Sequence, residues 1–223
     1  MKNVKSISAI LTLIFFIALF SGNNIFGQKT FEGKIKYKLT GGGKTAVMDY
    51  FTKGKNIRVE VNDVEKVVMI MKGKDILILM PGQKMYMKFP SDMMSKKGNN
   101  TEEKEFSPED LPKFKTGKSK KINGYNCDQY IITDENNTVE LWATKELGNF
   151  FFLEAPDGGE KSIQSAFNNM GFVPMIIISK NKAGKEEMKM EATEIKKMSI
   201  ESSMFDVPGN YKEFDMKNMF NQE

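Results

Sequence analysis

The chain has 223 residues, with 33 lysines and arginines against 29 acidic residues, a formal net charge of +4, one cysteine and no histidine. The lack of histidine excludes serine–histidine–aspartate, cysteine–histidine and zinc–histidine sites, because histidine is the commonest general base and metal ligand. Arg58 is the only arginine. Nucleic acid is therefore not an expected partner, since bidentate recognition of phosphate and guanine relies on arginine.

The first 27 residues predict a cleaved secretory signal peptide. Lys2 and Lys5 precede an apolar run over 7–20, which is short for a bilayer-spanning helix of roughly 20 residues. Gly27 is a small residue suited to a cleavage site. A retained N-terminal anchor is the alternative interpretation. No cysteine follows the predicted cleavage point that could serve as the lipid attachment site of a bacterial lipoprotein, so a soluble periplasmic or secreted protein is expected.

Residues 30–89 have the pattern of consecutive strands and turns. Apolar side chains from Phe31 to Leu39 alternate with charged ones, as in a strand with one buried face. Further strands are predicted over 47–53, 57–61, 65–72, 75–80 and 84–89. The last two strands place six apolar side chains on one face in either register of their turn: Ile76, Ile78, Met80, Met85, Met87 and Phe89.

The next segment, 90–114, loses this pattern and is predicted to be a charged loop or lid. Ser107-Pro108-Glu109-Asp110 favours a single helical turn, with serine at the N-cap and proline at the first helical position. The mixed signs of its charges are typical of a solvated surface.

A β-hairpin is predicted around residues 134–137, with strands over 127–133 and 138–144. If Thr133 faces Thr138, the apolar face of this hairpin carries Tyr130, Ile132, Val139, Leu141 and Ala143. The other face is mostly polar and is expected to meet water or a partly wet cavity.

The hairpin contains two features that could suggest a reactive or metal site, but a structural role is favoured for both. Cys127 is interpreted as a buried sheet residue rather than a reactive thiol, because no histidine is present to activate it. Alternating Asp134, Asn136, Thr138 and Glu140 loosely suggest calcium, but they lack the glycine and the spacing of a known loop, so a turn is favoured.

The C-terminal third predicts one helix and two more strands. Asp157 and Glu160 form a capping box, and apolar residues at helical spacing, Phe167 and Met170 among them, continue to Gly171. Strands follow over 175–179 and 187–200, residues 204–208 pack back on the body, and 211–223 form a frayed tail. The predicted fold is mainly β with few helices (β+α): a strongly curved antiparallel sheet or unclosed β-barrel of about ten strands with a helical lid.

Methionine is abundant, with 17 residues, many of them on the predicted apolar faces. Because its side chain is flexible and polarizable, a methionine-rich surface can repack around ligands of varying shape, such as acyl chains. Ordinary core packing is the alternative for any single methionine.

Six motifs together resemble a known secreted family. They are FEGKIKY from Phe31, KNIRVE from Lys55, LMPGQKMYM from Leu79, GYNCDQY from Gly124, VELWATKELG from Val139 and MFDVPGNY from Met204. This pattern is similar to the family known as domain of unknown function 4412, which resembles the LolA/LolB lipoprotein-localisation superfamily in organisation. The resemblance implies a single LolA-like half-barrel over 28–210 that holds acyl chains on its apolar side. It also implies that carrier members are soluble and receptor members lipid-anchored.

The resulting prediction is a soluble envelope protein that is not an enzyme, needs no cofactor and binds a lipid or the acyl chains of a lipoprotein, as a carrier or chaperone would. Its expected partners are a lipid or lipidated protein, with transient contact to a membrane or envelope protein, and it is expected to be a monomer. Arg58 matches the arginine of the family's K-x-x-R-like strand and is a candidate gating residue. The residues predicted to line the apolar cavity are Ile76, Ile78, Met85, Met87, Tyr130, Ile132, Leu141, Phe167 and Met170.

Two other classes remain open at this point. One is a structural or protein-interaction module with a solid core, whose partner binds an exposed strand edge or the lysine-rich loop. The other is an enzyme, which would require carboxylates converging in a polar cleft.

Overall fold

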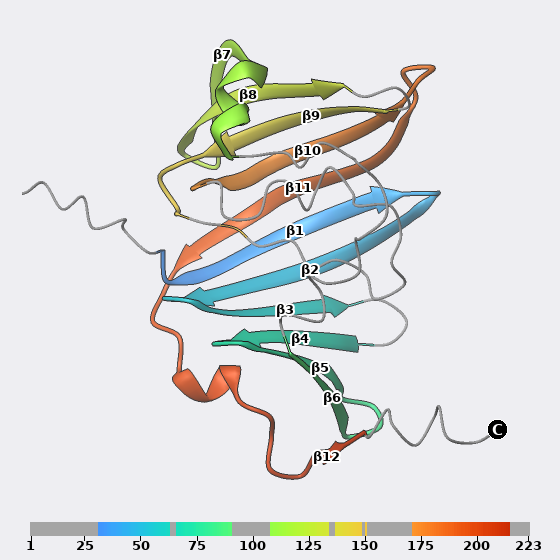
Figure 1. The fold of residues 1–223 in the computed structure, drawn as a ribbon, viewed down its shortest axis with the longest axis vertical. Coiled ribbons are helices and arrows are strands. Elements are labelled where there is room, and N and C mark those ends of the chain that lie inside the picture. Colours follow the sequence, from blue (N-terminus) through green and yellow to red (C-terminus); the bar gives the residue numbers. More distant parts are fainter. Residues whose placement is uncertain are drawn as a thin grey trace, which may run out of the picture.

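The computed structural model describes residues 31–62, 66–90, 108–133, 137–148, 150 and 171–214. The described strands form one twelve-stranded sheet in the order β12-β6-β5-β4-β3-β2-β1-β11-β10-β9-β8-β7 (Figure 1). All neighbours are antiparallel except β12 and β6. The strands are β1 (Gly33–Gly41), β2 (Lys44–Lys53), β3 (Asn56–Asn62), β4 (Lys66–Lys72), β5 (Asp75–Met80), β6 (Met85–Pro90), β7 (Lys115–Ile122), β8 (Tyr125–Thr133), β9 (Asn137–Thr144), β10 (Val173–Asn181), β11 (Glu186–Lys197) and β12 (Lys212–Glu213).

The sheet is large and unclosed, since β12 and β7 lie at its two ends. Strands β1 to β3 face the viewer in Figure 1, whereas β5 and β6 are seen nearly edge-on, so the sheet curls toward that end. The prediction of a mainly β chain with one open sheet is confirmed. The predicted helical lid is not supported: the described residues contain two 3-10 turns, η1 (Pro108–Phe114) and η3 (Ser202–Phe205), and no α-helix. The helix predicted from Asp157 to Met170 lies outside the described residues.

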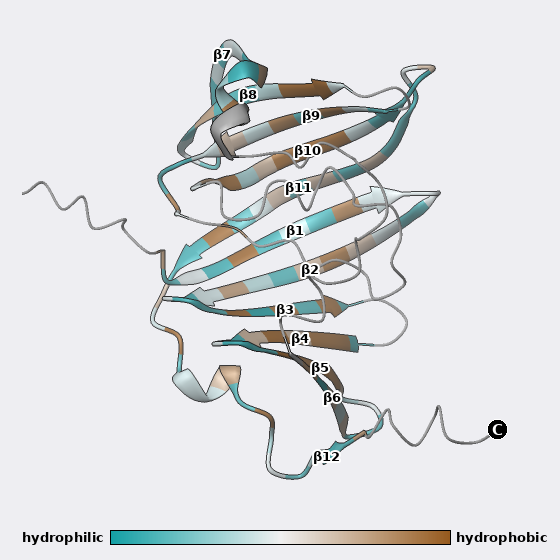
Figure 2. Cartoon of the chain, in the orientation of Figure 1, coloured by the Kyte–Doolittle hydropathy of each residue, from teal (hydrophilic) through white to brown (hydrophobic). Residues whose placement is uncertain are grey.

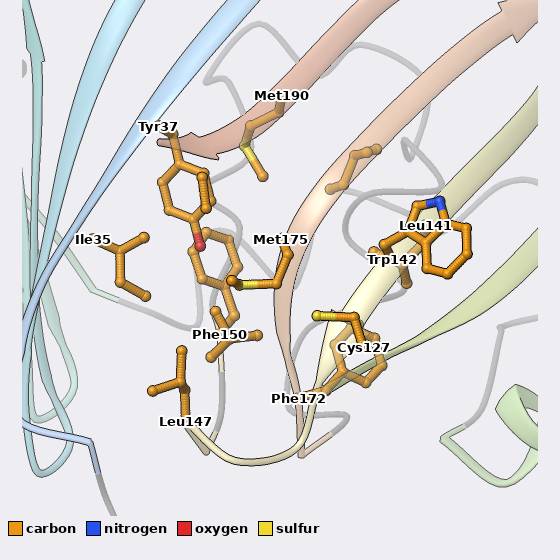
Figure 3. Close-up of a cluster of buried hydrophobic side chains, with 14 of the residues drawn as sticks. Ile35, Tyr37, Cys127, Leu141, Trp142, Leu147, Phe150, Phe172, Met175 and Met190 are labelled. Carbon is orange, nitrogen blue, oxygen red and sulfur yellow. The ribbon is translucent and has the colours of Figure 1, made fainter. Parts of the chain in front are cut away.

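One face of the sheet, called here the inner face, carries the main core. Tyr37 of β1 and Tyr50 of β2 lie two positions apart in the register of these paired strands. Both rings pack on Phe150: the centroid of Phe150 is 5.6 Å from that of Tyr37 and 4.5 Å from that of Tyr50. The Tyr37 hydroxyl donates a hydrogen bond of 3.0 Å to the carbonyl of Pro174, which satisfies a buried polar group. Figure 3 shows Tyr37, Phe150 and Met175 packed together. This half of the inner face is therefore filled by the chain's own side chains.

The opposite, outer face carries a second core that the C-terminal segment completes. Residues 198–214, called here the C-terminal clasp, leave β11, form η3 and end as β12 beside β6 (Figure 1). Phe205 is fully buried and packs with a cluster that includes Val68, Ile70 and Leu79 of β4 and β5. The predicted packing of 204–208 on the body is thus confirmed. The chain also pairs at Lys212 and Glu213, inside the range where a frayed tail was predicted.

A glycine at the start of β1 allows a close approach between β1 and β11. A Cβ atom on Gly33 would lie 2.1 Å from the carbonyl oxygen of Lys196 on β11. No larger residue fits there without moving one of the two strands. This explains the glycine in the first motif by packing rather than by chemistry.

Candidate ligand-binding face

The candidate site lies on the inner face of β4, β5 and β6, and is called here the methionine face. Cross-strand pairs place Met69 and Met71 opposite Ile78 and Ile76, which in turn lie opposite Met87 and Phe89. Ile76 and Ile78 are buried, whereas the other members are half-buried. Hydrophobic colour runs almost without a break along β4 in Figure 2. The complete set is Met69, Met71, Ile76, Ile78, Met80, Met85, Met87 and Phe89.

The structure brings four of the predicted lining residues together on this face, namely Ile76, Ile78, Met85 and Met87. Met69 and Met71 were not predicted to belong to this face. Strand β4 is apolar on both faces, so its sequence does not show which of its residues lie on the same face as Ile76 and Ile78. The register with β5 settles this. Phe167 and Met170 lie outside the described residues.

The other three predicted lining residues share the inner face but lie near the far end of the sheet. Tyr130, Ile132 and Leu141 belong to β8 and β9, and five strands separate β9 from β4. All three are buried members of the main core, and the ring of Tyr130 stacks on Phe172 with centroids 6.0 Å apart. They therefore belong to the packed main core, at least five strands along the sheet from the methionine face.

Arg58 lies on the outer face, opposite the methionine face. Its cross-strand neighbours are Phe51 and Ile70, both members of the second core. Its guanidinium donates to the carboxylate of Glu60 at 2.7 Å and to the carbonyl of Met204 at 2.9 Å. Gating by Arg58 stays a prediction, but these contacts give the side chain a structural role in holding the C-terminal clasp.

Glu60 sits between two cations beneath the clasp. Burial alone would raise the pKa of its carboxyl group, but hydrogen bonds from Lys66 and Arg58 outweigh burial and hold that pKa below its ordinary value. Glu60 is therefore ionised at neutral pH and anchors Arg58 in the orientation that reaches Met204.

The outer face of the β8–β9 hairpin is only in part the wet surface predicted for it, since Ile131 and Thr133 are exposed. The predicted register is confirmed, with Thr133 opposite Thr138, but Gln129, Trp142 and Thr144 are buried. The carboxylate of Glu140 accepts hydrogen bonds of 2.9 Å from Gln129 and from the Trp142 indole. The ammonium of Lys120, on β7, lies 3.9 Å from the centroid of the indole ring. Lys120 and Thr116 belong to β7, a strand that the sequence did not reveal, and their side chains contact Trp142 and Gln129 on this face.

The thiol and the carboxylate of the β8–β9 hairpin that the sequence singled out offer little reactive chemistry. Burial raises the pKa of the Cys127 thiol to about 11, so the thiol is protonated at neutral pH, as its interpretation as a sheet residue implied. Glu140, one of the residues of the loosely predicted calcium pattern, binds Gln129 and Trp142 through its carboxylate, while Asp134 and Asn136 lie outside the described residues. Among the described residues no group of three histidine, cysteine or acidic side chains could hold a metal ion.

None of the described segments forms a helix that is long and apolar enough to cross a membrane. No curated protein matches the sequence. A family model described as "Domain of unknown function (DUF4412)" matches residues 31–211.

Several solved structures are similar to this chain. The structure of an uncharacterized conserved protein from Thermus thermophilus has a TM-score of 0.48 at 9% sequence identity. The alignment covers 82% of the present chain and 90% of the Thermus thermophilus chain. A chain of the MucA/MucB complex of Pseudomonas aeruginosa has a TM-score of 0.45 at 10% identity, and the alignment covers 79% of the present chain and 56% of that chain. A domain assigned to outer membrane lipoprotein sorting in Vibrio parahaemolyticus has a TM-score of 0.31 at 13% identity, and the alignment covers 78% of the present chain and 88% of that chain. All three TM-scores are below 0.5, so these likenesses carry no conclusion about the present chain.

Proposed function

This chain belongs to the family described as Domain of unknown function (DUF4412), as its motifs predicted, and from that premise we propose that it is a non-catalytic binding protein of the cell envelope. The proposed ligand is a lipid or the acyl chains of a lipoprotein, held against the methionine face. The protein acts as a carrier or chaperone and uses no cofactor.

The observation that carries this proposal is the incomplete burial of the methionine face. Ile76 and Ile78 form a buried centre, and the six surrounding apolar side chains keep part of their surface exposed. Each buried methylene group of a ligand contributes about 0.8 kcal/mol, so an acyl chain gains substantial free energy by covering such a surface. Because methionine side chains adapt their shape, the face tolerates chains of different length and saturation.

The proposed site is centred on β4 to β6. Ile76, Ile78, Met85 and Met87 form its base, and Met69 and Met71 extend it toward β3. Tyr130, Ile132 and Leu141 remain in the proposal as the far wall of the same face, and Phe167 and Met170 as residues supplied by a segment outside the described part of the chain.

The proposed location follows from the first residues of the sequence. Cleavage of the predicted signal peptide over 1–27 delivers a single domain to the periplasm or the exterior, where lipids and lipidated proteins must cross water and need a carrier. The domain is proposed to act there as a monomer.

A fluorescent fatty acid such as cis-parinaric acid tests this proposal. The protein is expected to enhance its fluorescence with saturation, and Met69→Asp to weaken binding at least tenfold, because the carboxylate must be desolvated against the ligand. Met69→Leu and Met198→Asp serve as controls that retain binding; Met198 lies off the methionine face and is 45% exposed. If Met69→Asp fails to fold, Met87→Asp provides the same test from β6. Equal binding by all variants would contradict the proposed site.

A second candidate is an interaction module with a solid core. The observation in its favour is the dense packing of Tyr37, Tyr50, Phe150 and Phe172 on the inner face of β1 and its neighbours. This candidate would be favoured if the fluorescent fatty acid does not bind, or if it binds with saturation but with the same affinity in every variant.

A further inference from the structure

We infer that the outer edge of β7 is a docking edge for an extended, acidic segment of a partner protein. The two ends of the sheet differ. At one end, β12 pairs with β6 and covers it. At the other end β7 pairs only with β8 among the described strands. An uncovered edge presents a row of backbone donors and acceptors to another chain.

The hairpin that joins β7 to β8 fixes which backbone groups face outward. Asn123 and Gly124 have φ values of 50° and 86°, as in the two-residue turn that closes a tight hairpin. Ile122 pairs with Tyr125 across this turn, and such closing pairs are hydrogen-bonded. The alternation of an antiparallel ladder then leaves the N–H and C=O groups of Lys121 and Ser119 directed away from β8. These are the groups that an added strand would bind.

The charge of this edge selects the partner. Strand β7 contains Lys115, Lys118, Lys120 and Lys121 and no acidic residue, and its residues are exposed from Lys115 to Lys121. Lys115 is paired with Asp128 at 2.7 Å, and Lys120 lies over Trp142. Within the described part of the chain, no carboxylate forms an ion pair with Lys118 or Lys121. The ammonium groups of Lys118 and Lys121 are therefore two unneutralised cations on the same short stretch of β7 as the outward-facing backbone groups.

The same lysines argue against a second copy of this chain as the occupant. Two β7 edges laid side by side would bring their lysines together, and like charges on adjacent strands destabilise pairing. Lysines on an edge strand commonly prevent such self-association. An extended segment with carboxylates at alternate positions gains both the backbone hydrogen bonds and the charge pairing, as in β-strand addition.

The turn at the end of the edge is fixed to the body of the protein, which favours a docking edge over a mobile hairpin. The side-chain amide of Asn123 donates a hydrogen bond of 2.6 Å to the backbone carbonyl of Ala192, and the Ser119 hydroxyl donates one of 2.7 Å to the carboxylate of Asp128. A rigid edge binds a partner with a smaller loss of conformational entropy.

The test uses a fluorescein-labelled, acetylated and amidated peptide of alternating Glu and Thr, followed by anisotropy and by amide hydrogen exchange. The protein is expected to bind the peptide, and the exchange of the Ser119 and Lys121 amides to slow on binding. The variant Lys118→Glu/Lys121→Glu is expected to bind about tenfold more weakly, because two attractions become repulsions. The matched control Lys182→Glu/Lys185→Glu changes the same charge in the exposed β10–β11 turn and is expected to leave affinity unchanged.

Four results would overturn the inference. They are no binding at millimolar peptide, equal loss of affinity in the control variant, equal binding of an alternating Lys and Thr peptide, and no change of exchange at Ser119 and Lys121. Concentration-dependent dimerisation that Lys118→Glu/Lys121→Glu strengthens would show that the lysines guard the edge against other copies and do not recruit a partner. Binding of anionic lipid vesicles without binding of the peptide would assign the lysines to a membrane surface instead.

Discussion

Truncation of Phe205 tests whether the C-terminal clasp is part of the folding unit. Phe205 is 0% exposed and packs with Val68, Ile70 and Leu79 on the outer face. Phe205→Ala removes the ring and leaves a cavity between the clasp and the sheet. Buried phenylalanine-to-alanine changes cost about 3–5 kcal/mol, out of a total stability of about 5–15 kcal/mol for a domain.

Urea unfolding followed by far-ultraviolet circular dichroism measures this cost. The midpoint is expected to fall while the slope stays constant, because the same surface is exposed on unfolding. Met198→Ala is the matched control in the same segment, since Met198 is 45% exposed, and it is expected to change stability by less than about 0.5 kcal/mol.

The cost of Phe205→Ala has a ceiling that sharpens the test. If the clasp can detach alone, no substitution within it costs more than deletion of residues 199–223. A loss below about 1 kcal/mol for Phe205→Ala, or equal losses for Phe205→Ala and Met198→Ala, would refute the conclusion that the clasp completes the second core.

Three further predictions concern the outer face and the buried thiol. Arg58→Met is expected to destabilise the fold by about 1–3 kcal/mol through the lost bond to Met204 without changing fatty-acid binding; lost binding at unchanged stability would instead support gating. Because the pKa of Glu60 is lowered, its contribution to stability is present above an ordinary pKa of about 4.3 and is lost as the pH falls through the lower folded value. Glu60→Gln should flatten the unfolding free energy in that acid range, and an unaltered pH profile would contradict this. With a pKa of about 11, roughly one Cys127 thiol in a thousand is ionised at pH 8, so a disulfide reagent should label the native protein far more slowly than the urea-unfolded chain; comparable rates would show an accessible thiolate.

The strands with period-two alternation could be predicted from the sequence. Those of residues 33–90 and of the 125–144 hairpin have the expected positions, and the register of that hairpin is the predicted one. Turn residues between alternating runs determine such local pairings. The face shared by Ile76, Ile78, Met85 and Met87 followed from the same local rules.

The remaining features depend on contacts between distant residues. Strand β7 has no apolar alternation, because it is an exposed edge, and β12 is two residues long. Arg58 binds the carbonyl of Met204, 146 residues later, so a local motif could suggest its importance but not its partner. Trp142 is buried on a face whose sequence is mostly polar, and it is contacted there by Lys120 of the unrecognised β7.

The most direct test of the central claim is native mass spectrometry, with organic extraction, of the protein purified from the cells that produce it. The proposal predicts a stoichiometric lipid or acylated peptide that is lost in Met69→Asp and retained in Met69→Leu. A clean mass of the unliganded chain, together with no uptake of a fluorescent fatty acid, would contradict the proposed carrier function.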